Sequence, residues 1–456
     1  MVRTARAVTV GTIAALLVGV FAFAAGWVLA RASGPTPVDH LLIGLGNLGV
    51  RQATPADVRE DFSVFWQVWD LVEAEFYREQ PLDQQALVYG AIRGMLGSLD
   101  DEYTTFQEPD IAAQSRESMQ GKFEGIGAYL RLQDGEIAID RPFPESPAER
   151  AGLLPGDVIV AVDGQHLVPL VAGLDDAEAT ARAATLIRGP KGTVVTLTLR
   201  RPPATATFEV AITRDEVPLI SVNAEMLDGG VAYIQITEFK ATTTQLLDEA
   251  IREIAPQRPR SLVLDLRNNP GGFLTTAQEV LGRFYDGVAL YEEENGGIVK
   301  ELRTIAAPAD VRLYDVPMVV LINGGSASAA EIVAGALRDR RPNTSLLGEK
   351  SFGKGSVQNI HQLRDGSSAR ITIAHWFTPN RQEIHRIGIV PQYEVPASED
   401  PQYAVPCVAE REPPDGQATC SDAQLAWGLR LLAGQVPPQP PSTGSAPSSA
   451  VRPAAA

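Results

Sequence analysis

Residues 318–339 read MVVLINGGSASAAEIVAGALRD, and this stretch predicts the architecture of the body around it. It begins as a continuous apolar run, which is typical of a strand buried on both faces of a sheet. The Asn-Gly-Gly of residues 323–325 ends the run, and the apolar residues of 332–337 then recur at the spacing of a core-facing helix. A strand, a tight turn and a helix in this order indicate a mixed α/β sheet.

Two serines, Ser326 and Ser328, lie in the turn between this strand and this helix. The first backbone N–H groups of a helix have no partner within the helix, and they stabilise a negatively charged oxygen that forms beside them. Either serine can therefore act as a nucleophile by its position. Serine is also a common helix cap, and the spacing alone does not separate these two interpretations.

A second segment, residues 351–358 with the sequence SFGKGSVQ, places Lys354 between two glycines. A lysine there has no helix face to decorate, which indicates that the backbone delivers its ammonium group to a particular place. A lysine serves as the base for a serine when burial lowers its pKa and makes it neutral. The five histidines lie in strand-like runs or are scattered, and we interpret them as structural or surface residues.

A third segment, residues 262–272 with the sequence LVLDLRNNPGG, is a strand that runs into a Pro-Gly-Gly turn. Glycine allows the backbone to approach a substrate closely and to turn its N–H groups toward it. We expect Gly271 or Gly272 to donate one hydrogen bond to an oxyanion, and the N–H of Ala329 to donate the other.

The periodicity of apolar residues changes along the chain and divides it into regions. We expect an N-terminal transmembrane anchor or signal segment (1–34), a helical region (54–117), a small β-rich domain (118–216), a mixed α/β catalytic core (217–396), a C-terminal segment with two cysteines (397–435) and a disordered Pro/Ser/Ala tail (436–456). The expected fold class is therefore α+β and multidomain.

Residues 7–30 carry no charge and are long enough to cross roughly 30 Å of hydrocarbon as a helix. Arg3 and Arg6 precede this run, so the positive-inside rule places the N-terminus in the cytoplasm and the rest of the chain outside. A cleaved signal peptide is the alternative, because residues 30–32 fit a small-x-small cleavage site. Both interpretations export the chain, either to the outer face of the cell membrane or as a secreted protein.

Composition narrows the classes of function. The chain has 456 residues, of which 45% are hydrophobic and 21% charged, as in folded globular proteins. Its net charge of -17 repels phosphate backbones, so we expect no nucleic-acid partner. The only cysteines, Cys407 and Cys420, form no metal-binding pattern, so we expect no metal. In an oxidising compartment they either pair or remain free thiols.

The segments DLRNNPGG, NGGSASAAEI and SFGKGSVQ, in this order, resemble the motifs of the carboxyl-terminal processing protease family, serine endopeptidases with a Ser–Lys dyad. The resemblance implies that Ser328, rather than Ser326, is the nucleophile. It implies that Lys354 is the general base and that Gln358 positions Lys354. It also implies a catalytic core related to the crotonase and tricorn-core type.

The resemblance covers about residues 62–395, since the helical stretch LVYGAIRGMLGSLDDEYTTF also fits the family. Two positions depart from the family pattern. Gln392 follows a proline where the family usually has Asp, and Glu102 stands where the family often has Pro. Neither departure argues against a protease.

Residues 123–127, FEGIG, followed by SPAERAGLLPGDVIVAVDG at 146–164, resemble a PDZ domain. Such a domain binds a chain terminus by adding it as a strand to a sheet edge, while backbone N–H groups hold the terminal carboxylate. The resemblance implies that Gly125, Ile126 and Gly127 form this carboxylate-binding loop. An ordinary tight turn before a strand is the alternative.

These observations together predict a membrane-anchored, extracytoplasmic serine endopeptidase that captures protein C-termini and cleaves peptide bonds through an acyl-enzyme. Its expected partners are protein or peptide substrates and the membrane, and it needs no cofactor. The sequence leaves open whether it forms a homo-oligomer. A non-catalytic PDZ scaffold is the alternative function, but such a binder has no use for Ser328, Lys354 and Gln358 together.

Overall fold

The computed structural model describes residues 56–409 and 418–438, and the chain divides into two compact units with a boundary after Leu87. The predicted membrane segment and nearly all of the predicted tail lie outside the described residues. Within the described ranges, no helix combines the length and the apolar character that crossing a membrane requires.

The first unit contains α3 (Ala56–Glu75) and the first residues of α4 (Gln84–Gly97). Both helices lie where the apolar spacing predicts helical structure. Asp83 begins α4, because its carboxylate accepts hydrogen bonds from the N–H groups of Gln85 (2.9 Å) and Ala86 (3.0 Å). Several large apolar side chains of α3 are exposed: Phe62, Val64, Trp66, Val68 and Leu71.

In the second unit, the β-rich domain is built on a six-stranded antiparallel sheet in the order β3-β4-β5-β7-β8, with β6 paired to β5. Its strands are β3 (Ala128–Gln133), β4 (Glu136–Pro142), β5 (Val158–Val162), β6 (Gln165–His166), β7 (Val194–Arg200) and β8 (Thr207–Thr213), and its helices are α6 (Pro147–Arg150), α7 (Val168–Val171) and α8 (Asp176–Ile187). Val195, Leu197 and Leu199 alternate along β7 and are fully buried in the core that α8 covers.

A two-stranded pair connects this domain to the rest of the unit. β2 (Lys122–Gly125), which follows α5 (Pro109–Gln120), pairs antiparallel with β9 (Asp215–Pro218). The chain therefore enters and leaves the domain through neighbouring strands, which makes the domain an insertion ahead of the region predicted to be the catalytic core (residues 217–396), a name kept for it below.

The catalytic core is built on a second six-stranded sheet in the order β10-β11-β12-β15-β16-β19. Its strands are β10 (Val222–Leu227), β11 (Val231–Ile236), β12 (Ser261–Asp265), β15 (Met318–Ile322), β16 (Thr344–Gly348) and β19 (Tyr393–Glu394). β10 is antiparallel to β11, and every following pair is parallel. Because β12 and β15 are parallel neighbours, the turns at their carboxyl ends meet at the same edge of the sheet.

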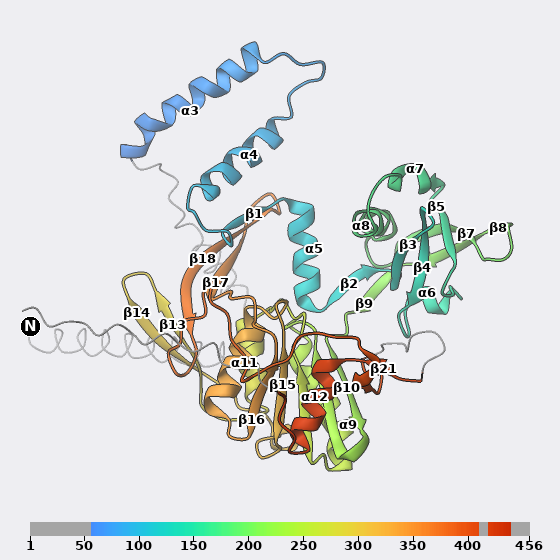
Figure 1. The fold of residues 1–456 in the computed structure, drawn as a ribbon. Coiled ribbons are helices and arrows are strands. Elements are labelled where there is room, and N and C mark those ends of the chain that lie inside the picture. Colours follow the sequence, from blue (N-terminus) through green and yellow to red (C-terminus); the bar gives the residue numbers. More distant parts are fainter. Residues whose placement is uncertain (1–55, 410–417, 439–456) are drawn as a thin grey trace, which may run out of the picture. The chain divides into compact units, whose positions relative to one another are not determined.

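This sheet is buried on both faces (Figure 1). The covering helices are α9 (Thr243–Ile254), α10 (Leu274–Leu281) and α11 (Ala329–Arg340) on one face, and α12 (Ala423–Leu432) on the other. Leu262 and Leu264 of β12 belong to the first cluster, and Val263 packs with Leu425 of α12 in the other. Burial on both faces explains why these strands read as continuous apolar runs.

A separate five-stranded sheet holds the segment after Lys354. Its strands are β1 (Thr105–Gln107), β13 (Val288–Glu294), β14 (Ile298–Arg303), β17 (Ser356–Gln362) and β18 (Ser368–Phe377). β18 lies at its centre and pairs antiparallel with β1, β13 and β17. The remaining short elements are the 3-10 helices η2 (Asp228–Gly230), η3 (Ala255–Gln257), η4 (Ala309–Val311) and η5 (Pro401–Tyr403).

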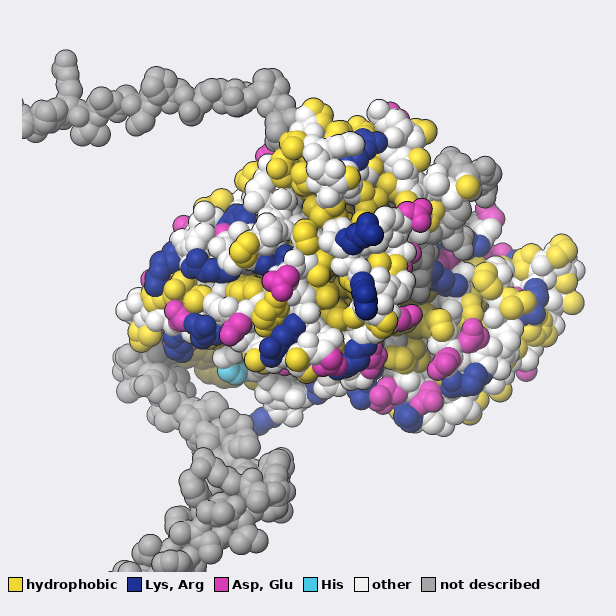
Figure 2. Space-filling model, turned by 90° about the horizontal axis from the view of Figure 1, so that it is seen from below, with side chains coloured by type: hydrophobic (Ala, Val, Ile, Leu, Met, Phe, Trp, Pro, Cys, Tyr) yellow, Lys and Arg dark blue, Asp and Glu magenta, His cyan; other side chains and the backbone are white. Residues whose placement is uncertain are grey.

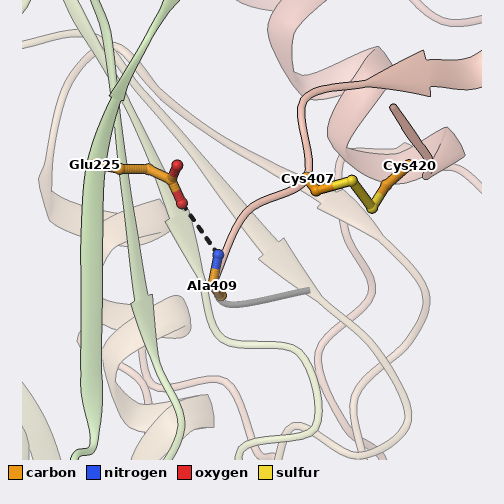
Figure 3. The surroundings of a disulfide bond; sticks show 4 residues. All are labelled: Glu225, Cys407, Ala409 and Cys420. Atoms are coloured by element: carbon orange, nitrogen blue, oxygen red, sulfur yellow. Dashed lines mark hydrogen bonds between the residues drawn. A yellow bond between two sulfur atoms is a disulfide. The ribbon is translucent and has the colours of Figure 1, made fainter. Parts of the chain in front are cut away.

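The C-terminal segment is attached to the catalytic core. Its strands β20 (Ala404–Val405) and β21 (Cys420–Ser421) pair antiparallel. A disulfide joins Cys407 to Cys420, which decides between the paired and free thiols that the sequence left open (Figure 3). Close by, the N–H of Ala409 donates a hydrogen bond to Glu225 of β10 (3.0 Å). These links and the packing of α12 make the segment part of the core.

Charged side chains of both signs are interspersed on the face that Figure 2 views, with apolar side chains between them. Exposed ion pairs of the second unit include Lys122 with Glu216 (2.6 Å) and Arg252 with Asp310 (2.8 Å). The excess of acidic residues in the chain therefore does not form one continuous negative patch on this face.

Candidate active site

The three glycine-rich segments of the catalytic core line one cavity of about 470 Å³. Its lining includes every residue that the sequence assigned to catalysis: Ser328, Lys354, Gln358, Ala329, Gly271 and Gly272. The segments are far apart in the sequence, and the parallel sheet together with the β17–β18 hairpin places them around one space.

Ser328 is the N-cap residue of α11, directly after the turn that follows β15. Its φ is +53°, a conformation that a non-glycine residue rarely adopts and that costs on the order of 1–3 kcal/mol. Its half-buried side chain lines the cavity at the first turn of α11, where the N–H of Ala329 has no acceptor among the described residues. Backbone strain of this kind is concentrated at functional sites, which favours Ser328 as the candidate nucleophile.

Ser326, the other candidate, has a different environment. It is fully buried and does not line the cavity. Its hydroxyl donates to the carbonyl of Leu266 (2.8 Å) and accepts from the N–H of Asn323 (3.0 Å). This hydroxyl braces the turn against the segment after β12, which favours Ser328 as the reactive serine.

The Pro-Gly-Gly turn contacts the Ser328 turn so closely that a side chain would not fit between them. A Cβ on Gly271, whose φ is +104°, would lie 2.7 Å from the Cβ of Ser328 and 2.9 Å from the backbone nitrogen of Ala329. Asn269 holds the two turns together, because its carbonyl accepts from the N–H of Ala327 (2.9 Å). Glycine at position 271 is thus a steric requirement of the site.

Of the N–H groups expected to bind the oxyanion, one already donates a hydrogen bond within the fold and two do not. The N–H of Gly271 donates to the side-chain oxygen of Asn269 (2.9 Å) and is therefore engaged within its own turn. In the described part of the chain, the N–H groups of Gly272 and Ala329 have no acceptor. The geometry favours these two as the oxyanion donors.

Lys354 is half-buried, and burial lowers the pKa of its ammonium, assisted by the positive charge of Arg370. Two hydrogen bonds from Trp376 fix the loop that carries Lys354. The indole N–H of Trp376 donates to the carbonyl of Lys354 (3.1 Å), and its backbone N–H donates to the carbonyl of Gly355 (2.9 Å). The ammonium nitrogen lies 4.9 Å from the centre of the Tyr103 ring. Among the described residues, no hydrogen bond joins it to Ser328.

The resemblance implied that Gln358 positions Lys354, but among the described residues no hydrogen bond joins the two side chains. The amide nitrogen of Gln358 donates to the hydroxyls of Ser356 (2.8 Å) and Thr372 (3.2 Å). The reason is strand geometry, because residues two apart on β17 share a face and β18 supplies the cross-strand partner. Gln358 lies in the cavity, but the expected contact is not made in this structure.

Glu331 is a central residue that the sequence interpretation missed. It is fully buried, and burial raises its pKa. Its carboxylate accepts hydrogen bonds from the N–H groups of Ser328 (2.8 Å), Gly353 (2.7 Å) and Lys354 (2.9 Å), and from the hydroxyl of Ser351 (2.6 Å). The available signal was the spacing Ser328-x-x-Glu331, which is that of a capping box.

A second cavity, of about 450 Å³, lies in the β-rich domain between β3 and α8. Ile126 and Gly127 line it, whereas Gly125 does not and instead pairs with Asp215 of β9. The carbonyls of Ile126 and Gly127 accept hydrogen bonds from Ala148 (2.8 Å) and Phe143 (2.9 Å), which fixes the loop. β3 is an edge strand of its sheet, so this groove has a backbone edge that can pair with another strand.

Three family models match parts of the chain. The model of peptidase family S41 matches residues 230–395, that of the PDZ domain matches 139–201, and that of the activating protease CtpB N-terminal domain matches 47–110. The chain is 38% identical over 360 residues to the carboxy-terminal processing protease CtpA of Bacillus subtilis, covering 78% of this chain and 72% of the relative.

The carboxy-terminal processing protease CtpB of the same organism is 36% identical over 331 residues, which are 71% of this chain and 66% of the relative. A solved structure titled photosystem II D1 C-terminal processing protease is 30% identical and covers 73% of this chain and 86% of that chain, with a TM-score of 0.41.

Proposed function

This chain belongs to the carboxy-terminal processing proteases, which are serine peptidases of family S41, and we propose that Ser328 is its nucleophile and Lys354 its general base. The observation that carries this proposal is the shared cavity. Ser328, Lys354 and the free N–H groups of Gly272 and Ala329 surround one space that is large enough for a peptide segment.

The chemistry follows from these groups. A neutral Lys354 accepts the hydroxyl proton of Ser328 while the serine oxygen attacks the scissile carbonyl. The negative charge on the tetrahedral oxygen is stabilised by the N–H groups of Gly272 and Ala329. The proton on Lys354 then passes to the departing amine, and a water molecule activated by the same lysine hydrolyses the acyl-enzyme. No step needs a cofactor.

The position of Lys354 in this structure corresponds to a state of the proposed dyad before proton transfer. The ammonium of Lys354 lies over the Tyr103 ring and has no hydrogen bond to Ser328 among the described residues. The side-chain nitrogen of Lys354 must therefore move closer to the Ser328 hydroxyl before it can accept the serine proton. Burial, which lowers the pKa of Lys354, favours the neutral form that this step requires.

We further propose that the PDZ domain captures the C-terminus of the substrate in the groove between β3 and α8. The edge of β3 would pair with the terminal strand of the substrate, and the N–H groups of Ile126 and Gly127 would hold its carboxylate. Leu130 and Ile187 contribute apolar surface to the groove, which suits an apolar C-terminal side chain.

Export and membrane anchoring are also proposals. The uncharged run at residues 7–30 supports both. The disulfide between Cys407 and Cys420 supports export, because disulfides persist in oxidising compartments. The catalytic part would then act on proteins outside the cytoplasm.

The test is cleavage by the purified full-length protein in detergent. Peptides with one scissile region and either a free or an amidated C-terminus are incubated with the enzyme, and fragments are mapped by mass spectrometry. We expect cleavage that is lost in Ser328→Ala and slowed roughly 10- to 100-fold by amidation. Cleavage that survives Ser328→Ala would disprove the nucleophile, and equal rates for both peptides would disprove carboxylate capture.

A further inference from the structure

Arg370 of β18 lines the same cavity as Ser328 and Lys354. Its side chain is half-buried, and its Nε atom is buried without a hydrogen-bond partner. Across the described residues, its guanidinium makes no ion pair and no stacking contact. A cation therefore faces the catalytic cavity with nothing in the fold to neutralise it.

The arginines of the second unit that are more deeply buried than Arg370 are all paired. Their partners are Ile187 and Thr193 for Arg214, Asp265 and Asp422 for Arg267, Asp248 for Arg283, and Leu313 and Thr344 for Arg341. Removing a guanidinium from water without such partners is unfavourable, and the fold avoids it elsewhere. The unpaired Arg370 indicates that its partner arrives with a ligand.

The cavity itself offers no counter-ion. Glu238 is the one carboxylate among the described residues that line it, and it already pairs with the ammonium of Lys240 (2.9 Å). The field of Arg370 contributes to the lowered pKa of Lys354, which the proposed mechanism uses as a neutral amine. Among the residues that line the cavity, no free carboxylate is left to pair with Arg370, which favours an anionic ligand.

We propose that Arg370 forms an anion subsite of the catalytic cavity that binds a carboxylate of the peptide substrate. A guanidinium and a carboxylate match in shape and form paired, charge-assisted hydrogen bonds. A peptide offers this group in two places, as an Asp or Glu side chain near the scissile bond or as its own C-terminus. The inference rests on the proposed function, since it requires a peptide in this cavity.

The experiment compares the wild-type full-length protein with Arg370→Gln, which removes the charge, and Arg370→Lys, which keeps the charge and loses the planar fork. Arg364→Gln is the matched control, because Arg364 is an exposed arginine in the turn between β17 and β18 and does not line the cavity. The substrates are peptides that carry Gln at every position around the scissile bond, single Glu replacements of them, and the amidated form of each.

In the wild type, we expect one carboxylate to raise kcat/KM roughly 10- to 100-fold, chiefly through KM. Arg370→Gln should abolish this preference, Arg370→Lys should keep part of it, and Arg364→Gln should keep all of it. A preference for one Glu position assigns a side-chain subsite. If the preference for a free C-terminus disappears in Arg370→Gln, Arg370 binds the terminal carboxylate of the substrate. If that preference persists in Arg370→Gln, it arises from the PDZ groove.

Binding of the same peptides, labelled with a fluorophore, to Ser328→Ala protein with and without Arg370→Gln tests the subsite without catalysis. A loss of carboxylate-dependent affinity in the double variant supports the subsite even if no peptide is cleaved, an outcome that would count against the proposed function alone. If Arg370→Gln leaves every carboxylate preference unchanged in both assays, or no carboxylate alters either, the anion subsite is disproved. Thermal unfolding of each variant verifies that it is folded.

Discussion

The Oε2 atom of Glu331 lies 2.9 Å from the backbone nitrogen of Lys354, and the same oxygen accepts the N–H of Ser328 at 2.8 Å. One buried carboxylate thus joins the backbones of the proposed nucleophile and the proposed base. The other carboxylate oxygen accepts from Ser351 and Gly353, so it fixes the loop on the amino side of Lys354. Glu331 is a positioning residue, since it contacts the carriers of the reacting groups.

Replacing Glu331 by Gln should therefore lower kcat more than it raises KM. An amide nitrogen in place of one oxygen would face N–H donors that need an acceptor, and buried donors left unpaired cost about 1–3 kcal/mol each. We expect kcat to fall roughly 10- to 1,000-fold with a lower melting temperature. Glu331→Asp keeps two acceptor oxygens and should recover part of kcat. A normal kcat in Glu331→Gln, or an effect confined to the melting temperature, would contradict the positioning role.

The lowered pKa of Lys354 predicts the pH dependence. Only the neutral amine is a base, so the rate should rise with pH through a midpoint below 10.5, the ordinary lysine value from which burial lowers this pKa. Lys354→Arg should be inactive at every pH, because a guanidinium stays protonated. The measurement is kcat/KM against pH, and near-normal turnover by Lys354→Arg would exclude the general-base role.

Tyr103 should influence that midpoint. The ring lies 4.9 Å from the ammonium and stabilises the charged form, while Arg370 opposes the charge and Asp101 and Glu331 favour it. Removing the ring in Tyr103→Leu should move the midpoint down by about half to one pH unit. Tyr103→Phe keeps the ring and is the control. The phenol itself will not interfere, since burial raises the pKa of Tyr103 to about 12. An equal shift in both variants would refute the contribution of the ring.

Gly271 and Gly324 form a matched pair for steric tests. A Cβ on Gly271 would lie 2.7 Å from the Cβ of Ser328, and its φ of +104° disfavours any other residue, whereas a Cβ on Gly324 meets no atom within 4 Å. Gly271→Ala should lower kcat at least 100-fold, because the turn must move away from the nucleophile. Gly324→Ala should stay within about twofold of the wild type. Similar activity for the two variants would show that the close approach is not required.

The parts of the site with local signals were predictable, and the parts that depend on tertiary contact were not. The turn that holds Ser326 and Ser328, the Lys354 loop and the Pro-Gly-Gly turn each interrupt a regular pattern with glycines, so the sequence indicated these three segments as candidates. The choice of Ser328 over Ser326 came from the family resemblance. Arg370 and Tyr103 are single residues in an ordinary strand and loop. Only the pairing of β1, β17 and β18 brings Arg370 to the cavity and the Tyr103 ring to the ammonium of Lys354. The contacts of Gln358 were missed because spacing from Lys354 does not reveal which cross-strand hydroxyl lies nearer.

The same distinction applies to the fold. Continuous apolar runs indicated strands buried on both faces, but nothing local showed that α12, from the C-terminal segment, covers the second face. The cysteine pair was likewise undecided, because pairing depends on how β20 and β21 approach each other.

The two serines of the turn provide the last test. Ser328→Ala removes the hydroxyl that lines the cavity, so proteolysis should be lost. The side chain also belongs to the capping box with Glu331 at the start of α11, so the free energy of unfolding should fall by no more than the contribution of one helix cap, about 0.5–2 kcal/mol. Ser326→Ala removes a hydroxyl that joins Leu266 to Asn323 in a fully buried position, and should cost about 1–3 kcal/mol of stability. Below its melting temperature, this variant should keep at least a tenth of the wild-type kcat. Thermal unfolding and kcat measured on both proteins separate the roles, and a stable but inactive Ser326→Ala beside an active Ser328→Ala would reverse the assignment.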